Sequence, residues 1–180
     1  MYSCRAAFLL ILFVFLSACG DNLLPSGEDK RTPVSAGSAG GGVTQKFPDF
    51  SVTDILGAPI TLSSATAGKK GAVFYFTMWC PICDSHMSDM RTSTTPLFPD
   101  VNFFLIDYIS GSVAGAARAA TENGYAIGVF TTLADTDHTL LNIFQATMGT
   151  TVVIDNTGIV RMNEDYRDGV NLRKTLSVLP

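Results

Sequence analysis

Short apolar runs recur through the second part of the chain and set its predicted architecture. The runs rich in β-branched and aromatic residues occupy 72–76, 101–106 and 151–154. A nearly continuous run of this kind is typical of a strand buried on both faces of a sheet. Helices are predicted between these strands, at 81–91, 113–123 and 137–146. Strands that alternate with helices predict βαβ units and a largely parallel sheet.

Alternating apolar and polar positions at both ends of the predicted domain add antiparallel pairs. Residues 50–53 and 60–62 alternate around a stretch of turn residues, so they predict an N-terminal β-hairpin. The turn at Asp155–Gly158 predicts that residues 159–162 run back antiparallel to the strand before it. A last helix is expected at 170–179, with leucines along one face.

An apolar run near the N-terminus has the pattern of an export signal. It follows Arg5, ends at Leu16, and is shorter than the roughly 20 residues that span a bilayer as a helix. The segment Leu16-Ser17-Ala18-Cys19 resembles the lipobox of bacterial lipoproteins. That resemblance implies cleavage before Cys19, lipidation of Cys19 and loss of Cys4 with a signal peptide at 1–18; a plain cleaved signal is the alternative.

A segment rich in glycine, serine and proline separates this signal from the predicted domain. Residues 20–46 carry six of the 16 glycines and no apolar period. Together with Cys19 they are expected to form a flexible tether at 19–46. The folded part is then 47–180, a single domain of ordinary size.

Composition narrows the possible functions. The net charge of −4, from 16 acidic and 12 basic residues, predicts no binding to nucleic acid. Four cysteines are too few for a scaffold built on disulfides. If Cys4 and Cys19 belong to the leader and the anchor, Cys80 and Cys83 remain to carry chemistry.

Cys80 and Cys83 stand directly after the first buried strand and at the start of the following helix. The unpaired N–H groups and the dipole of a helix N-terminus stabilise a thiolate at such a position. A zinc site would need two more soft ligands, and only His86 and His138 are available. A static disulfide closing so small a loop would add little stability. Redox chemistry is therefore the favoured interpretation.

Several motifs in the predicted domain resemble one protein family. They are Phe47-Pro48-Asp49-Phe50, Asp54, Gly57, Leu62, the segment Phe76-Thr77-Met78-Trp79-Cys80-Pro81-Ile82-Cys83, the segment 150–155 and Gly158. These resemble the redoxin/TlpA-like branch of the thioredoxin superfamily, and they are similar to the alkyl hydroperoxide reductase/thiol-specific antioxidant (AhpC/TSA) family. The resemblance implies an α/β, thioredoxin-like fold: a central mixed sheet flanked by helices, with an added N-terminal β-hairpin.

The resemblance also implies an extracytoplasmic thiol-disulfide oxidoreductase that needs no organic cofactor or metal. Cys80 would be the exposed attacking thiolate and Cys83 the buried resolving thiol of a redox-active disulfide. Its partners would be protein thiols and disulfides and a membrane-side electron donor. Substrate contacts are expected from Trp79, Pro81, Gly149 and Thr150.

Two departures from the family pattern affect the predicted site. Gly149 stands where such proteins place a cis-proline, which leaves substrate geometry and metal access open. His86 stands where the TlpA-like branch often has glutamate, one helical turn after Cys83, and could donate and accept protons; an exposed helix histidine is the alternative. Met78, Met87 and Met90 are expected to fill gaps in the core.

Two other functions use the same cysteines. A Cu(I) metallochaperone would bind the metal through Cys80 and Cys83, since soft thiolates suit Cu(I). A thiol peroxidase would use Cys80 as the peroxidatic cysteine, because Thr77 and Cys80 have the Thr-x-x-Cys spacing of peroxiredoxins. That family also has a proline upstream of this threonine, which is absent here.

Overall fold

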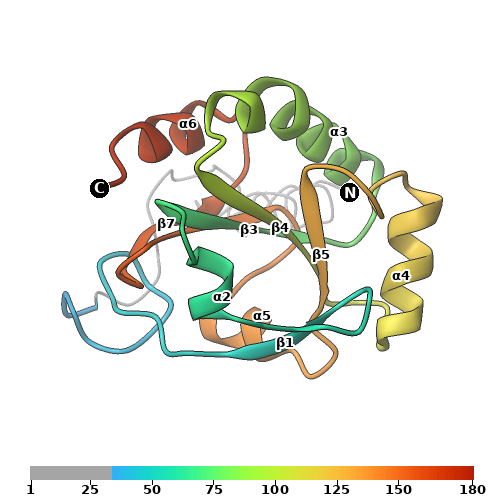
Figure 1. The fold of residues 1–180 in the computed structure, drawn as a ribbon, viewed down its shortest axis with the longest axis horizontal. Coiled ribbons are helices and arrows are strands. Elements are labelled where there is room, and N and C mark those ends of the chain that lie inside the picture. Colours follow the sequence, from blue (N-terminus) through green and yellow to red (C-terminus); the bar gives the residue numbers. More distant parts are fainter. Residues whose placement is uncertain (1–33) are drawn as a thin grey trace, which may run out of the picture. The chain divides into compact units, whose positions relative to one another are not determined.

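The computed structural model describes residues 34–180, in which seven strands form one sheet (Figure 1). The strands are β1 (Ser51–Asp54), β2 (Pro59–Thr61), β3 (Gly71–Thr77), β4 (Val101–Asp107), β5 (Phe130–Ala134), β6 (Thr150–Asp155) and β7 (Val160–Asp165). Their order across the sheet is β2-β1-β5-β4-β3-β6-β7. The predicted hairpin and the three predicted buried strands are all present, and β3 lies between β4 and β6.

The helices are short and follow the strands closely. They are α2 (Leu62–Thr66), α3 (Pro81–Asp89), the π-helical turn η2 (Met90–Thr94), the 3₁₀ turn η3 (Thr95–Leu97), α4 (Val113–Glu122), α5 (Thr139–Phe144) and α6 (Val170–Ser177). The helix predicted to end near Arg91 changes into π and 3₁₀ turns instead. In this stretch the Thr92 and Thr95 hydroxyls bond back to the carbonyls of Ser88 and Arg91, which disturbs regular helix geometry.

The sheet is mixed, as the family resemblance implied, but it is less parallel than the βα alternation predicted. Only β3–β4 and β4–β5 are parallel among the pairings described, and the other four are antiparallel. The reason lies after α5, where the Gly149 N–H bonds the carbonyl of Phe76 at 2.9 Å, near the end of β3. Strand β6 therefore starts where β3 ends and must run antiparallel to it.

Strand β5 was missed by the sequence analysis. It carries two threonines in the middle of five residues, so its apolar run is too short to stand out, although most of it is buried. Threonine is β-branched and fits a pleated sheet, which was the available signal. Because β5 pairs with both β1 and β4, it joins the N-terminal hairpin to the central sheet.

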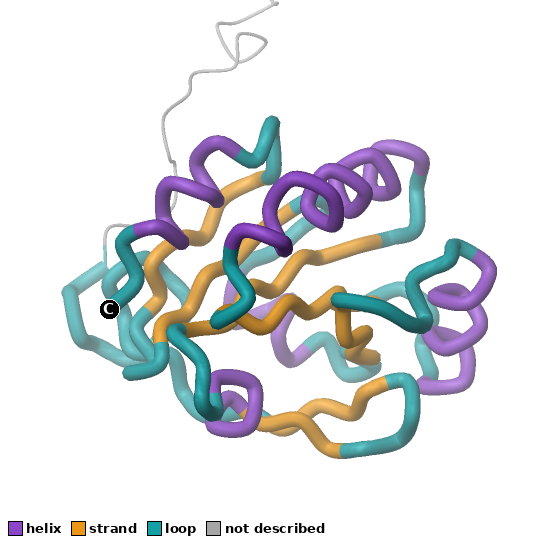
Figure 2. Tube along the Cα trace, turned by 45° about the horizontal axis from the view of Figure 1, so that its top comes forward, coloured by secondary structure: helices purple, strands orange, loops and turns teal. Residues whose placement is uncertain are grey.

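The side chains of β3 alternate between two cores, one on each face of the sheet. Phe74 and Phe76 face a core completed by α2 and α5, whereas Val73 and Tyr75 face a core completed by α3 and α6. Figures 1 and 2 show α3 and α6 together on one side of the strands, and Figure 1 shows α2 and α5 on the other. Tyr75 thus points toward the helix that carries the cysteines.

The compact unit that contains this fold begins at Val34, earlier than the start expected at Phe47. Within it the Thr44 N–H bonds the carbonyl of Val160 at 2.8 Å, and Gln45 is buried. Residues 34–46 of the expected tether therefore pack on the domain. The predicted signal peptide, Cys4 and Cys19 lie outside the described residues. Among residues 34–180 no helix is both long and apolar enough to cross a membrane.

Candidate active site

The two cysteines lie at the junction between β3 and α3. Trp79 has a φ of +59°, an uncommon conformation for a residue other than glycine, and its N–H donates to the Thr77 hydroxyl at 3.0 Å. Cys80 is the N-cap of α3, and Pro81 takes the first helical position, where a missing N–H costs nothing. This turn places Cys80 beyond the edge of the sheet.

The two thiols differ in accessibility. Both are free; Cys80 is half-buried, whereas Cys83 is 0% exposed. The Cys83 N–H donates to Cys80 Sγ at 3.2 Å, as expected for a capping residue. A substrate disulfide can therefore reach Cys80, while Cys83 lies one helical turn further into the protein.

The two thiols are linked by hydrogen bonds that shift their pKa values in opposite directions. Desolvation, followed by the hydrogen bond that the Cys80 thiol donates to Cys83, raises the pKa of Cys80. Burial works to raise the pKa of Cys83, but hydrogen bonds from the Cys80 thiol, from backbone N–H groups and from the Thr77 hydroxyl outweigh it and lower that pKa. The family resemblance implied that Cys80 is the attacking thiolate, and that role stays a prediction.

Trp79 is held by a buried carboxylate on β4. Its Nε1–H donates to Asp107 Oδ2 at 2.7 Å, and Asp107 is only 2% exposed. The same carboxylate accepts the N–H groups of Ile109 and Ser110 and the Ser110 hydroxyl. Asp107 therefore fixes both the indole beside Cys80 and the loop that follows β4.

His86 is half-buried, and its imidazole lies beside two tyrosines. Its Nδ1 lies 3.0 Å from the Tyr75 hydroxyl, and its ring lies 4.8 Å from that of Tyr166. Burial lowers the pKa of His86, and nearby Asp89 opposes that shift only in part. The imidazole is therefore neutral near pH 7 and can accept a proton.

Gly149 ends the loop that faces α3, and Thr150 is the first residue of β6. The described residues contain no cis peptide bond, and Gly149 has a φ of +88°. A Cβ at Gly149 would lie 3.9 Å from the His86 ring. Thr150 is 4% exposed, accepts the Thr147 N–H and donates to Asp165, so its side chain supports the loop.

Exposed apolar side chains flank the site in the sequence. Met78 is 41% exposed, Ile82 55% and Met148 36%, and they adjoin Trp79, Cys83 and Gly149 respectively. The sequence analysis assigned Met78 to the core and was wrong there; Met87 and Met90 are buried as expected. The turn at Trp79 carries Met78 out of the sheet, which explains the difference.

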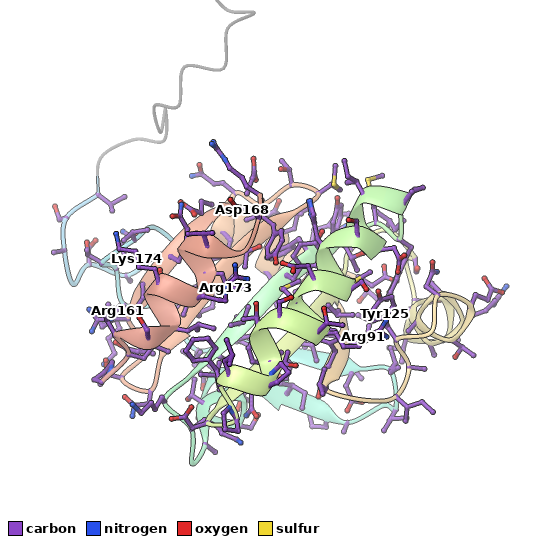
Figure 3. All side chains as sticks on the ribbon, turned by 90° about the horizontal axis from the view of Figure 1, so that it is seen from above. Arg91, Tyr125, Arg161, Asp168, Arg173 and Lys174 are labelled. Carbon is purple, nitrogen blue, oxygen red and sulfur yellow. The ribbon has the colours of Figure 1, made fainter. Side chains whose placement is uncertain are left out.

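Tyr125 holds α3 on the side that faces away from α6 (Figure 3). The Tyr125 hydroxyl donates to Asp84 Oδ1 at 2.6 Å, and the Arg91 guanidinium lies 4.9 Å from the Tyr125 ring centre. On the other side Arg173 of α6 lies 3.8 Å from Asp89. Side-chain contacts therefore hold α3, the helix that carries the cysteines, on two sides.

Residues 34–180 contain no cluster of three or more histidine, cysteine or acidic side chains suited to hold a metal ion. His138 caps α5 and bonds the carbonyl of Tyr108, so it belongs to the structure of that helix. Tyr75 and Asp107 were missed as site residues. Their only sequence signal was a polar group within or at the end of a buried strand.

Paired thiols at a helix N-terminus on this fold define the class of the protein: it is a thioredoxin-like thiol-disulfide oxidoreductase. Residues 43–163 match the AhpC/TSA family, and the chain belongs to that family. No curated protein sequence matches the chain at a significant level.

Solved structures share the fold at low sequence identity. A thioredoxin-like protein from Aeropyrum pernix has a TM-score of 0.59 and 17% identity, covering 72% of this chain and 88% of its own. A secreted Mycobacterium tuberculosis disulfide oxidoreductase homologous to E. coli DsbE has 0.55 and 21%, covering 72% and 96%. The M. tuberculosis peroxidoxin BcpB has 0.57 and 21%, covering 75% and 94%. Each is similar in fold.

Proposed function

We propose that the protein reduces disulfide bonds of exported proteins through a Cys80/Cys83 dithiol-disulfide cycle, while it is anchored to a membrane by a lipid on Cys19. The observation that carries the catalytic part is the pairing of an accessible Cys80 with a fully buried Cys83 at the N-terminus of α3. A substrate disulfide can contact the Cys80 sulfur, whereas the buried Cys83 sulfur is placed to react with Cys80.

The cycle begins when a substrate disulfide approaches Cys80. The Cys80 thiol passes its proton to Cys83, and the Cys80 thiolate attacks one substrate sulfur. The substrate S–S bond breaks, a mixed disulfide forms on Cys80, and the leaving thiolate takes a proton from water. Exposed Met78, Ile82 and Met148 offer an apolar surface to an extended substrate segment.

The second step releases the substrate. Cys83 loses its proton and attacks Cys80 Sγ, which breaks the mixed disulfide and leaves a Cys80–Cys83 disulfide. The second substrate sulfur leaves as a thiolate and takes a proton from water, so the substrate has gained two electrons and departs as a dithiol. A membrane-side dithiol donor then restores the reduced pair, so no organic cofactor takes part.

Export and anchoring are supported by the signal-like run and the lipobox-like Leu16-Ser17-Ala18-Cys19. The secreted relative from M. tuberculosis is compatible with work outside the cytoplasm. Anchoring by acyl chains is stable because each buried methylene contributes about 0.8 kcal/mol.

Insulin reduction tests the catalytic proposal. The assay uses the purified full-length chain with Cys4→Ser and Cys19→Ser, so that Cys80 and Cys83 are its only thiols. Added Cys80→Ser should abolish reduction, because no accessible thiol remains. Added Cys83→Ser should instead accumulate a mixed disulfide on Cys80, visible by mass spectrometry. Reduction that continues at the parent rate in Cys80→Ser would refute the proposal.

A thiol peroxidase is the second candidate, favoured by membership in the AhpC/TSA family. Here Cys80 would attack peroxide and Cys83 would resolve the sulfenic acid. The Thr77 hydroxyl, however, accepts from Trp79 and bonds Cys83, so it is not directed at Cys80. Stopped-flow mixing of the reduced chain with hydrogen peroxide separates the candidates: the peroxidase requires oxidation much faster than that of free cysteine.

A further inference from the structure

The buried Cys83 must release a proton before it can resolve the mixed disulfide, and the structure surrounds it with few routes for that proton. Cys83 is 0% exposed, as is Tyr75, and both belong to the core between β3 and α3. Water therefore cannot reach the thiol directly. The proton has to pass through a side chain.

Tyr75 stands between Cys83 and a partly exposed base. Its hydroxyl lies 3.0 Å from His86 Nδ1. After desolvation, both cysteines raise the pKa of Tyr75, and Cys83 does so in part through a hydrogen bond from the Tyr75 hydroxyl. A hydroxyl has one proton, so once Cys83 is protonated, its S–H can donate to Tyr75 Oη and the Tyr75 O–H can donate to His86 Nδ1. Because its pKa is raised, the Tyr75 phenol stays protonated near neutral pH. It can therefore accept one proton only while it gives up another. His86, neutral through burial, can take that proton at Nδ1 when its other nitrogen carries the hydrogen.

We propose that Tyr75 carries the Cys83 proton to His86 during resolution of the mixed disulfide, a role that rests on the proposed dithiol cycle. The Cys83 S–H proton moves to Tyr75 Oη while the Tyr75 O–H proton moves to His86 Nδ1. Cys83 becomes a thiolate, His86 an imidazolium and Tyr75 is unchanged. The thiolate then attacks Cys80 Sγ, and His86 returns its proton to solvent.

The surroundings of His86 fit this role. Tyr166, from the loop before α6, packs against the imidazole, and its hydroxyl donates to Asp89 of α3. Asp89 in turn lies near Arg173 of α6. Gly149 has no side chain, and a Cβ there would lie 3.9 Å from the His86 ring. The titratable and charged groups around the relay are the two cysteines, Tyr75, Tyr108, Tyr166, Asp89 and, through Asp89, Arg173.

Single-turnover reaction with dithiobis(nitrobenzoate) isolates the step. One equivalent added to the reduced Cys4→Ser/Cys19→Ser chain releases a first thionitrobenzoate as Cys80 attacks and a second as Cys83 resolves. Tyr75→Phe should slow the second release by about 10- to 100-fold, within the range of general acid–base effects, and leave the first within about twofold. His86→Gln should have a similar effect, and the double variant should be no slower than either single one.

The pH profile distinguishes proton transfer from a structural role. In the parent chain the second rate should fall as pH drops through the lowered pKa of His86; in Tyr75→Phe it should rise with pH over the alkaline range instead, as Cys83 ionises to water. Tyr125→Phe is the matched control, because this buried hydroxyl bonds Asp84 and neither His86 nor Cys83. Circular dichroism verifies that each variant is folded.

Three results would overturn the proposal: a second rate in Tyr75→Phe equal to that of the parent, a slowed rate whose pH profile is unchanged, or equal slowing in Tyr125→Phe. The dithiol cycle is judged separately. If the parent chain resolves its thionitrobenzoate adduct but leaves insulin intact, the substrate assignment fails and the relay stands. If Tyr75→Phe resolves as the parent does while insulin is reduced, the relay alone fails.

Discussion

Gly149 shows how one residue can reshape the neighbourhood of a redox pair. Its φ of +88° belongs to the left-handed region, which costs other residues roughly 1–2 kcal/mol. Its N–H bonds the carbonyl of Phe76, and its own carbonyl accepts the Tyr166 N–H at 2.8 Å. Proline could supply neither that φ nor the N–H. The loop is therefore built for glycine, and the imidazole of His86 lies beside it.

Restoring the family's proline should damage this loop. Gly149→Pro is expected to lower the free energy of unfolding by about 3 kcal/mol or more, because φ would be fixed near −65° and the bond to Phe76 lost. Gly149→Ala should cost about 1–2 kcal/mol from backbone strain alone. Urea denaturation of the full-length chain measures both values.

Gly124→Ala is the matched control for Gly149→Ala, since Gly124 has a φ of +75° and open space around its Cβ position. It should cost about the same. A Gly149→Pro chain as stable as the parent would show that this backbone conformation is not required.

Some features of the site could be predicted from the sequence, and others could not. Cys80, Cys83 and Pro81 were identified from local order, because a strand followed by a capped helix can be seen in the sequence. The contact of His86 with Tyr75 could not, because it depends on which face of β3 each side chain takes and on how α3 lies across the sheet. The conformation of Gly149 was likewise set by the neighbouring strands.

At the scale of elements, the end of β4 organises the loop next to the cysteines. Asp107 accepts four hydrogen bonds there, one from the indole of Trp79 and three from the loop. Strand β4 lies beside β3 with Asp107 opposite Thr77, so the two strand ends are in register. The position of Trp79 therefore depends on an element far from it in the sequence.

Asp107→Ala should loosen this arrangement. The expected loss in unfolding free energy is about 3 kcal/mol, since several buried donors lose a charged acceptor. Trp79 is the only tryptophan, so its fluorescence should become more readily quenched by acrylamide. Asp84→Ala, which removes an exposed carboxylate from the same neighbourhood, should change both quantities much less. Equal effects of the two substitutions would contradict the assignment to Asp107.

The hydrophobic pattern predicted the elements of the central sheet well, with β5 as the exception. Burial on both faces makes a strand conspicuous, as in β3, whereas a five-residue strand with two threonines resembles a loop. The direction of β6 could not be derived from pattern. It follows from where the loop at Gly149 meets the end of β3, which is a tertiary contact.

At the scale of the whole molecule, the proposed anchor at Cys19 precedes, in the sequence, the compact unit that begins at Val34. Cells that express the full-length chain and are supplied with labelled palmitate should yield a labelled protein that sediments with membranes. Cys19→Ser should abolish both the label and the sedimentation, whereas Cys4→Ser should retain them. Label that persists in Cys19→Ser would refute lipidation at this residue.

Residues 34–46 pack at one end of the sheet. Thr44 and Phe47 bond β7 and the turn before it, at the end of the sheet where Gly71 pairs with Asp155. Cys80 follows the opposite end of β3, after Thr77. Residues 34–46 therefore occupy the end of the sheet opposite the thiols. The segment through which the chain enters the domain leaves the edge of the sheet at Cys80 open to arriving substrates.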